Sequence, residues 1–325
     1  MTELLKKLML AHGVSGREEN IREVIRKEAE PYADEISVDP VGSLIVRKKG
    51  NGKKIMICAH MDEIGFFVNY IDEKGLIKVS AVGGIDTLSA SYTEVVSENG
   101  VYGVIVPEST KDVPKIDGMY IDIGAKTKKQ AEKKVKVGEY FVCVPSMRRL
   151  MGTRYVGRPF DDRVGCAILL EALKNVKTTE NDLYFVFATQ EEVGSRGARP
   201  AAYNVTPDIG INIDVTGTGD KPGSIPMTVK LGGGCTVKLK DPSVICSPKI
   251  VNKMRELAEE NGIKYQNEVL TYGGTDTSVI QIAGGGVEVG AISIPSAFIH
   301  SSVEMIDMFD VKEAVKLTTV LCEKL

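Results

Sequence analysis

The chain has 325 residues, of which 26% are charged and 43% hydrophobic, and its formal net charge at pH 7 is −3. This length is enough for about two domains of ~150 residues, and the composition is typical of a globular protein with a sizeable core. The small negative charge provides no general attraction to nucleic acid or to an anionic membrane, so neither is expected as a partner. No apolar run approaches the roughly 18 residues of a membrane helix.

The start of the chain and the cysteines indicate a cellular compartment. Residues 1–10 alternate charged residues with leucines and lack the uninterrupted apolar stretch of a signal peptide. The six cysteines are scattered, contain no Cys-x-x-Cys pair and mostly have apolar neighbours. This pattern predicts free, buried thiols in a reducing compartment, and we therefore expect a cytoplasmic protein.

The first sixty residues predict one helix followed by strands. Ser15-x-x-Glu18 has the pattern of a capping box, and the apolar residues after it recur at helical spacing, so a helix is expected over 18–30. Strands are expected at 36–38 and 43–47, and the apolar segment 54–59 is typical of a buried strand.

The pattern changes between about residues 66 and 152. Short β-rich pieces alternate there with turn pairs such as Asn99-Gly100, and only the segment 127–134 has a helical pattern. We interpret 66–152 as a small β-rich domain, PDZ-like or barrel-shaped, inserted into a larger domain made of 1–65 and 153–325. The lysines of this segment are interpreted as a solvated face, because acidic residues accompany them and no aromatic residue lies between them.

The second half of the chain alternates helical and strand patterns. Helices are expected over 161–175, from Ser247-Pro248 to just before Gly262, and over 310–325. The continuous apolar runs 183–189 and 209–215 predict central strands that are covered on both faces. This alternation predicts an α/β fold of three α/β/α layers around a mixed, largely parallel sheet.

Histidines and carboxylates follow several of the expected strands. The chain has three histidines, of which His60 follows the apolar run 55–59 and His300 closes the run 292–299. The acidic groups with similar placement are Asp161-Asp162, Glu191-Glu192 and Asp214. Ligands of open α/β sheets bind outside the carboxyl ends of the strands, so these distant segments are expected to meet at one edge. Imidazole and carboxylate groups are ligands that zinc and cobalt use.

Each of these residues also has a plain structural interpretation. His60 alone would pass for an ordinary polar residue at a strand end, and Glu191-Glu192 for a solvated loop. Either Asp161 or Asp162 would serve to cap the following helix, and sequence spacing does not separate the two. The third histidine, His12, has no acidic partner nearby and is interpreted as structural. The placement of the whole set at strand ends favours a metal site, in which a carboxylate bridges two metals and a free carboxylate acts as general base.

Short segments spread over essentially the whole chain carry a resemblance to one known family. They are Gly13-Val14-Ser15-Gly16-x-Glu18, Ala59-His60-Met61-Asp62-Glu63-Ile64-Gly65, Gly157-Arg158-Pro159-Phe160-Asp161-Asp162-Arg163, Thr189-Gln190-Glu191-Glu192-Val193-Gly194, Asn212-Ile213-Asp214, Gly274-Thr275-Asp276 and Ile299-His300-Ser301. In their order and spacing the chain resembles the M42 metallo-aminopeptidases, the family of the tetrahedral aminopeptidases, whose members have also been named glutamyl aminopeptidases or endoglucanases.

The resemblance implies two divalent metal ions per subunit, Zn²⁺ or Co²⁺, and a role for each matching residue. One metal would be held by His60, Asp161 and Asp214, and the other by Asp161, Glu192 and His300, with Asp161 bridging. Glu191 would be the general base, and Asp62 would orient the imidazole of His60. The peptide bond between Asp161 and Asp162 is expected to be cis. The segment Gly274, Thr275 and Asp276 would shape the substrate site.

Two positions depart from the family pattern. Ala297-Phe298 stands where the family often has an arginine followed by an aromatic residue, and Ser302 replaces a frequent proline. The implied metal ligands are all present, so the missing arginine bears on the contacts with the substrate and leaves the metal shell complete.

The resulting hypothesis is a metal-dependent aminopeptidase that removes N-terminal residues from short peptides, with a bridging water activated by the metals and Glu191 carrying the proton. The resemblance also implies that the inserted domain forms a dimer and that dimers assemble into a tetrahedral dodecamer. The alternatives are a dinuclear deacylase or dipeptidase and a metal-binding homologue without turnover. A glycosidase is disfavoured, because that chemistry uses two carboxylates without histidine-bound metal.

Overall fold

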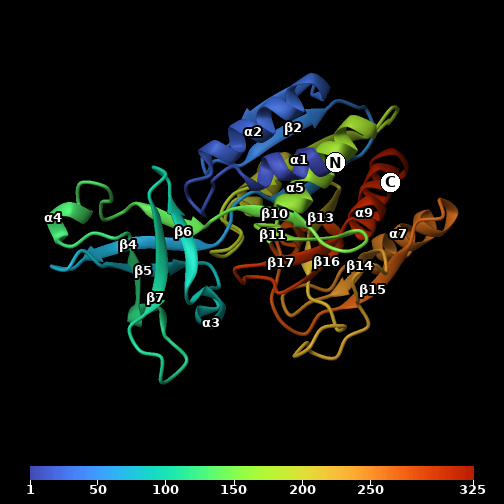
Figure 1. Ribbon diagram of the computed structural model, residues 1–325. Coiled ribbons are helices and arrows are strands. Elements are labelled where there is room, and N and C mark those ends of the chain that lie inside the picture. Colours follow the sequence, from blue (N-terminus) through green and yellow to red (C-terminus); the bar gives the residue numbers. More distant parts are fainter.

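A mixed sheet of 11 strands forms the centre of the larger part of the molecule, in a computed structural model that describes residues 1–325 (Figure 1). The central strands are parallel and lie in the order β12 (Asp182–Ala188), β3 (Lys54–His60), β13 (Ile209–Thr216) and β16 (Glu288–Ala297). Nearly all their residues are buried, because helices cover both faces of the sheet.

Antiparallel strands complete the sheet on both sides of this parallel centre. They are β1 (Glu35–Val38), β2 (Leu44–Lys48), β10 (Ser146–Arg149), β11 (Arg154–Arg158) and β17 (Glu304–Asp307). A further strand, β14 (Cys235–Lys240), pairs antiparallel with β16 and parallel with β15 (Tyr265–Val269). The predicted mixed, largely parallel sheet is therefore present.

Helices cover the two faces of the sheet unequally. One face carries α1 (Thr2–Met9), α2 (Glu19–Ala29), α5 (Arg163–Asn175), α7 (Pro248–Glu260) and α9 (Met308–Lys324), which enclose a core of 49 buried residues. The other face carries α6 (Ala198–Val205) and α8 (Thr277–Gln281), over a smaller core of 12 residues. This arrangement confirms the predicted three-layer α/β/α fold.

Helix α5 shows how the sequence produces one of these elements. The Asp162 carboxylate caps its first turn by accepting a hydrogen bond from the Gly165 amide at 3.0 Å. Most of the helix is buried between the sheet, α1 and α9, which explains its nearly all-apolar sequence. Ala172 accepts the last cap hydrogen bond from Val176, where the backbone becomes extended.

The start of α2 differs from the expected capping box. The helix begins at Glu19, close to the predicted position, but its N-cap residue Glu18 makes no side-chain capping hydrogen bond. Ser15 instead donates to Asp62, and Glu18 accepts from the backbone of Gln190. The capping-box interpretation is wrong, because both side chains are buried against other segments that offer them tertiary partners.

A closed barrel of six strands forms the second body (Figure 1). Its strands, in the order in which they pair, are β4 (Gly65–Ile71), β5 (Ile77–Val82), β8 (Met119–Asp122), β7 (Tyr102–Pro107), β6 (Thr93–Ser97) and β9 (Tyr140–Cys143). The barrel has a core of its own with 14 buried residues. Short helices α3 (Thr87–Ala90) and α4 (Lys128–Ala131) and the 3₁₀ turn η2 (Ile116–Gly118) connect its strands, and a similar turn, η1 (Glu30–Tyr32), follows α2.

The predicted β-rich body is thus present as a separate barrel, whereas α4 is shorter than the helix expected over 127–134. The hairpin β10–β11 spans residues 146–158 and pairs within the large sheet. It crosses the expected boundary at 152, so the division into 1–65 with 153–325 and 66–152 stays a prediction.

Two expectations from composition can be compared with the structure. All six cysteines are free and buried, as predicted. Among the helices, none combines the length and the apolar character that crossing a bilayer would require.

Candidate metal centre

The five side chains expected to bind metal come together at one edge of the large sheet. His60 ends β3, Asp214 lies near the end of β13, and Glu192 follows β12. His300 follows β16, and Asp161 precedes α5. They form two triads, in each of which the candidate ligand atoms all lie within 4.8 Å of one another: His60, Asp161 and Asp214, and Asp161, Glu192 and His300.

Asp161 belongs to both triads. Its Oδ1 atom lies 3.0 Å from Nε2 of His60, and its Oδ2 atom lies 3.2 Å from Nε2 of His300. Asp214 Oδ1 lies 3.9 Å from Nε2 of His60. Glu192 Oε2 lies 3.1 Å from Nε2 of His300. Each carboxylate oxygen of Asp161 therefore faces a different histidine.

The neighbouring Asp162 lies in a different setting. Its Oδ1 atom caps α5, while its Oδ2 atom is buried without a hydrogen-bond partner. The peptide bond between Asp161 and Asp162 is cis, as expected from the resemblance. The geometry thus separates the two aspartates, which sequence spacing left open, because only Asp161 contacts both histidines.

The donor set fits two divalent cations. Two ligand atoms about 2.1 Å from one zinc ion at the tetrahedral angle lie ~3.4 Å apart. The distances between candidate ligand atoms within the triads are similar, from 3.0 to 3.9 Å. Burial raises the pKa of Asp214 to about 8, although His60 counteracts this shift. Burial and the charge of Asp161 also raise the pKa of Glu192. Such crowded acids are the environment that a bound cation neutralises.

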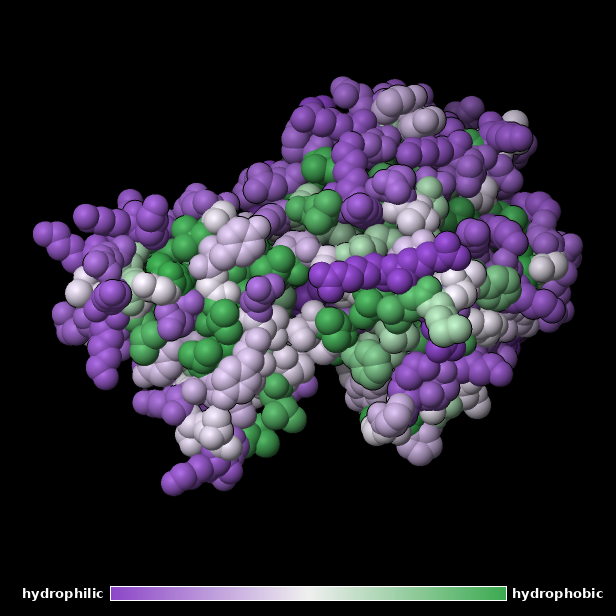
Figure 2. Space-filling model, in the orientation of Figure 1, coloured by the Kyte–Doolittle hydropathy of each residue, from purple (hydrophilic) through white to green (hydrophobic).

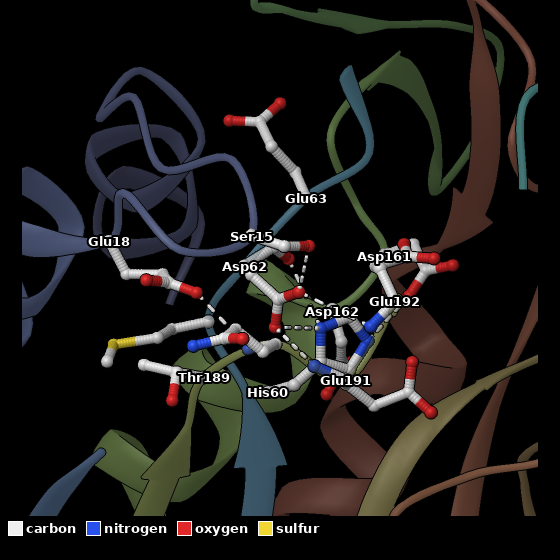
Figure 3. A network of polar contacts seen from close by, with 12 residues as sticks. Ser15, Glu18, His60, Asp62, Glu63, Asp161, Asp162, Thr189, Glu191 and Glu192 are labelled. Atoms are coloured by element: carbon white, nitrogen blue, oxygen red, sulfur yellow. Dashed lines mark hydrogen bonds and ion pairs between the residues drawn. The ribbon is translucent and has the colours of Figure 1, made fainter. Parts of the chain in front are cut away.

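Asp62 connects His60 to the segment that carries Glu191 (Figure 3). Its buried carboxylate lies 3.4 Å from Nδ1 of His60 and accepts hydrogen bonds from the amides of Glu191 at 3.0 Å and Glu192 at 3.3 Å. Ser15 Oγ donates to it at 2.6 Å. Burial alone would raise the pKa of Asp62, but His60 and Ser15 outweigh it and lower the pKa.

A cavity of about 810 Å³ opens over both triads. Its wall includes Glu191, which belongs to neither triad. Burial and neighbouring carboxylates raise the pKa of Glu191 well above its usual value. Gly274 and Thr275 also line the cavity, whereas Asp276 is 1% exposed and is not part of the lining. The structure therefore places two of the three residues expected to shape the substrate site at the cavity surface.

The sequence interpretation missed Glu304 in β17, which is fully buried. Its Oε2 atom accepts the amide of Phe160 at 2.6 Å and that of Asp161 at 3.2 Å, and its Oε1 atom accepts the amide of His300 at 3.3 Å. Arg158 lies 3.6 Å away and balances its charge. An acidic residue inside a short apolar strand pattern is the signal that would have identified it.

A pair of glycines directly after β5 was also missed. A Cβ atom on Gly84 would lie 3.0 Å from Nδ1 of His300, and one on Gly83 would lie 3.2 Å from Oε2 of Glu192. The backbone that follows this barrel strand therefore lies directly against the second triad, and a side chain at either position would clash with a candidate ligand.

The two departures from the family pattern lie on either side of His300 in the sequence, Ala297-Phe298 before it and Ser302 after it. Ala297 is buried, and Phe298 lines the cavity with 45% of its surface exposed. Phe298 and His300 have φ angles of 64° and 62°, a left-handed conformation that is uncommon for residues other than glycine. An apolar aromatic side chain thus lines the cavity close in sequence to His300 of the second triad.

Comparison with protein families gives an assignment for this architecture. The family profile described as M42 glutamyl aminopeptidase matches residues 42–317. The chain belongs to the M42 peptidase family. A curated relative, a putative aminopeptidase of Acetivibrio thermocellus, is 48% identical over 98% of this chain and 97% of its own length. The lysyl aminopeptidase of Pyrococcus furiosus is 34% identical over 99% of this chain and 97% of its own length.

Solved structures agree with this membership of the M42 family. An aminopeptidase from the archaeon Desulfurococcus kamchatkensis superposes with a TM-score of 0.96 at 35% identity, over 99% of this chain and 94% of its own. The TET1 peptidase of Pyrococcus horikoshii, which can assemble into a tetrahedron or a large octahedral shell, superposes with a TM-score of 0.90 at 35% identity, over 100% of this chain and 99% of its own. The fold with its separate barrel is therefore that of M42 aminopeptidases.

Proposed function

We propose that this M42 peptidase is a metal-dependent aminopeptidase that removes N-terminal residues from short peptides. The observation that carries the proposal is the carboxylate of Asp161, which belongs to both candidate metal-binding triads beneath one cavity. Glu191 lies in the wall of the same cavity and outside both triads, where a proton-transferring group is needed.

The proposed ligands are His60, Asp161 and Asp214 for one divalent ion, and Asp161, Glu192 and His300 for the other. When bound there, two Zn²⁺ or Co²⁺ ions supply Lewis-acid polarisation of the scissile carbonyl and lower the pKa of water. Asp62 holds the Nδ1 side of His60, so that Nε2 faces the first triad. Glu191 accepts a proton from the attacking water and delivers it to the departing amine.

The carboxylates at the cavity also suit the free amine of a peptide substrate. A protonated α-amine is attracted to negative charge, and an acylated one has lost that charge. The cavity volume of about 810 Å³ lies within the ~300–1,000 Å³ that is common for small-ligand sites, so it suits a short peptide segment better than a folded chain.

The test compares free-amine aminoacyl-anilides with their N-acetylated twins. The protein is stripped of metal and then reconstituted with Zn²⁺ or Co²⁺. The panel includes acidic, basic and apolar N-terminal residues, because relatives are named glutamyl and lysyl aminopeptidases. We expect cleavage of the free-amine series alone, and only after metal is restored. Cleavage of only the acetylated series would instead indicate a deacylase, and absence of turnover with two ions bound would indicate a non-catalytic homologue.

We also propose that the barrel forms a dimer with a second copy, and that dimers assemble into a tetrahedral dodecamer. Apolar side chains gather on the surface of the barrel that faces the viewer (Figure 2). The exposed apolar residues of the barrel include Leu88, Tyr92, Tyr102, Val104 and Val113. An exposed apolar group of this kind is typical of a protein interface, and the shells of the TET1 peptidase support the same assembly here.

The mass of the particle in solution tests this assembly. We expect the wild-type chain of 35.2 kDa to elute as about twelve copies in light scattering with size-exclusion chromatography, and Tyr102→Lys to shift the mass towards smaller species. Tyr203→Lys on α6 is the matched control, because both tyrosines are 67% exposed. A monomeric wild type, or dissociation by Tyr203→Lys but not by Tyr102→Lys, would contradict the proposal.

A further inference from the structure

Three consecutive backbone amides in the segment that carries Glu191 are held by buried carboxylates (Figure 3). Asp62 accepts the amides of Glu191 and Glu192. Glu18 accepts the amide of Gln190 at 3.1 Å through its Oε1 atom. The segment before the proposed general base is therefore anchored from the N-terminal part of the chain, about 170 residues away in sequence.

The N-terminal segment that carries Glu18 is itself hydrogen-bonded to the connection between β3 and β4. The amide of Ser15 donates to the carbonyl of Glu63 at 3.3 Å, and the amide of Glu63 donates to the carbonyl of Gly13 at 3.0 Å. The same Oε1 atom of Glu18 also accepts the amide of Gly16 at 2.8 Å. Because these contacts fix the backbone around residue 16, Glu18 holds Gln190 from a rigid base.

The carboxylate of Glu18 makes no hydrogen bond with the first turn of its own helix. Glu18 is the N-cap residue of α2, yet it makes no capping hydrogen bond there, and it is 3% exposed. Burial of a carboxylate is costly unless it is hydrogen-bonded. Hydrogen bonds from the amides of Gly16 and Gln190 offset the cost of burying the Glu18 carboxylate. The position of this carboxylate is therefore determined by its contact with the loop at Gln190.

The conformation of that loop needs such an anchor. Gln190 has a φ angle of 55°, which a residue with a side chain adopts only when its surroundings impose it. The loop then closes on itself, since the carbonyl of Glu191 accepts the amides of Gly194 at 2.8 Å and Ser195 at 2.9 Å. With both ends held, the turn at Gln190 sets the direction in which the Glu191 side chain leaves the backbone.

We propose that Glu18 is a positioning residue for Glu191: by accepting the Gln190 amide it holds the turn that aims the Glu191 carboxylate at the cavity. The proposal deepens the proposed function, because it rests on Glu191 as the proton-transferring group. Glu18 closes the segment Gly13-Val14-Ser15-Gly16-x-Glu18, which carries part of the resemblance to the M42 family, but that resemblance implies no role for it.

The test compares Glu18→Ala with Glu18→Gln. The alanine variant removes the acceptor, and we expect kcat to fall by about 10–100-fold with KM within about threefold, since a small misplacement of a catalytic group has an effect of this size. The glutamine variant retains a carbonyl oxygen at the same place and should keep kcat within about threefold of wild type. Bound metal, measured by mass spectrometry of the elements, should remain at the wild-type level in both.

Asp310→Ala is the matched control for a general loss of stability. Asp310 is also a fully buried carboxylate that accepts two backbone amides, from Gly232 at 2.8 Å and Gly234 at 2.7 Å, but neither it nor these glycines line the cavity. We expect Asp310→Ala to lower the melting temperature without changing kcat. If Glu18→Ala does not fold, Glu18→Asp withdraws the acceptor by one methylene while retaining the charge, and the same fall in kcat is expected.

Hydrogen exchange of the loop amides provides a second readout that is independent of turnover. The Gln190 and Glu191 amides should exchange faster in Glu18→Ala than in wild type and in Asp310→Ala. Full kcat in folded, metal-loaded Glu18→Ala, or unchanged exchange at Gln190, would overturn the proposal. If the wild-type protein shows no peptidase turnover, the proposed function fails, while the exchange at Gln190 still decides whether Glu18 holds the turn.

Discussion

Replacing Glu191 with glutamine is expected to lower kcat by about 10²–10⁴-fold, the usual contribution of a general base. Glutamine has nearly the same shape as glutamate but cannot accept a proton at neutral pH. Glu191 belongs to neither triad, and the backbone contacts that hold its segment involve its amide and carbonyl. The variant should therefore bind both metal ions and a substrate-like inhibitor as wild type does, and KM should change little.

Single-turnover kinetics with metal analysis checks this expectation. The matched control is Glu192→Gln, the adjacent carboxylate, which contacts His300 at 3.1 Å and belongs to the second triad. Glu192→Gln should lose affinity for one ion, whereas Glu191→Gln should lose turnover with both ions in place. Substantial activity in Glu191→Gln would remove Glu191 from the proton transfer and leave a different cavity carboxylate as the base.

The sequence predicted the convergence of the candidate ligands because the central strands are parallel and buried. Runs such as 183–189 are continuously apolar, and parallel strands place their carboxyl ends at one edge of the sheet. His60 and Asp214 therefore meet without any local sequence signal linking them. The convergence of the ligands requires only that these strands are parallel neighbours in one sheet, which their continuous apolar runs indicate. It does not require the exact bounds of each strand.

The supporting residues could not be predicted in the same way. Glu304 and Glu18 accept hydrogen bonds from backbone amides of segments far away in the sequence. Because nearly every residue has a backbone amide, the residue types of those segments do not reveal such a contact. Glu18 even matched a local motif, the capping box, whose helix is present but whose hydrogen bonds are not. The buried carboxylate of Glu18 accepts hydrogen bonds from the amides of Gly16 and Gln190, and these contacts take the place of the expected capping hydrogen bonds.

The edge strands of the sheet were likewise hard to predict from the sequence. β10 and β15 are short, only partly buried and rich in polar residues, so neither an apolar run nor a clear alternation marks them. The loops that line the cavity, including the wall around Tyr272 and Phe298, carry no periodicity at all. If the proposed function is correct, the preference for the N-terminal residue of the substrate will depend on these walls, and the anilide panel will measure that preference.

Asp161→Ala is expected to abolish binding of both metal ions, and with it all activity. Each oxygen of Asp161 faces a different histidine, so its removal takes a ligand from both triads at once. Even residues that only support a ligand commonly cost ~10–100-fold in metal affinity, and a shared ligand should cost more. Asp214→Ala and His300→Ala each remove a ligand from one triad, and we expect them to keep about one ion per chain after dialysis.

Metal content per chain and the metal-dependent rise in melting temperature measure this difference. A ligand present at 100 times its Kd stabilises the folded state by about 2.7 kcal/mol, so wild type should gain stability on adding Zn²⁺ and Asp161→Ala should not. Asp162→Asn is the control, because asparagine can still accept the Gly165 amide and cap α5. Two ions bound to Asp161→Ala, or none bound to Asp162→Asn, would transfer the bridging role to the neighbouring aspartate and contradict the geometry, in which only Asp161 contacts both histidines.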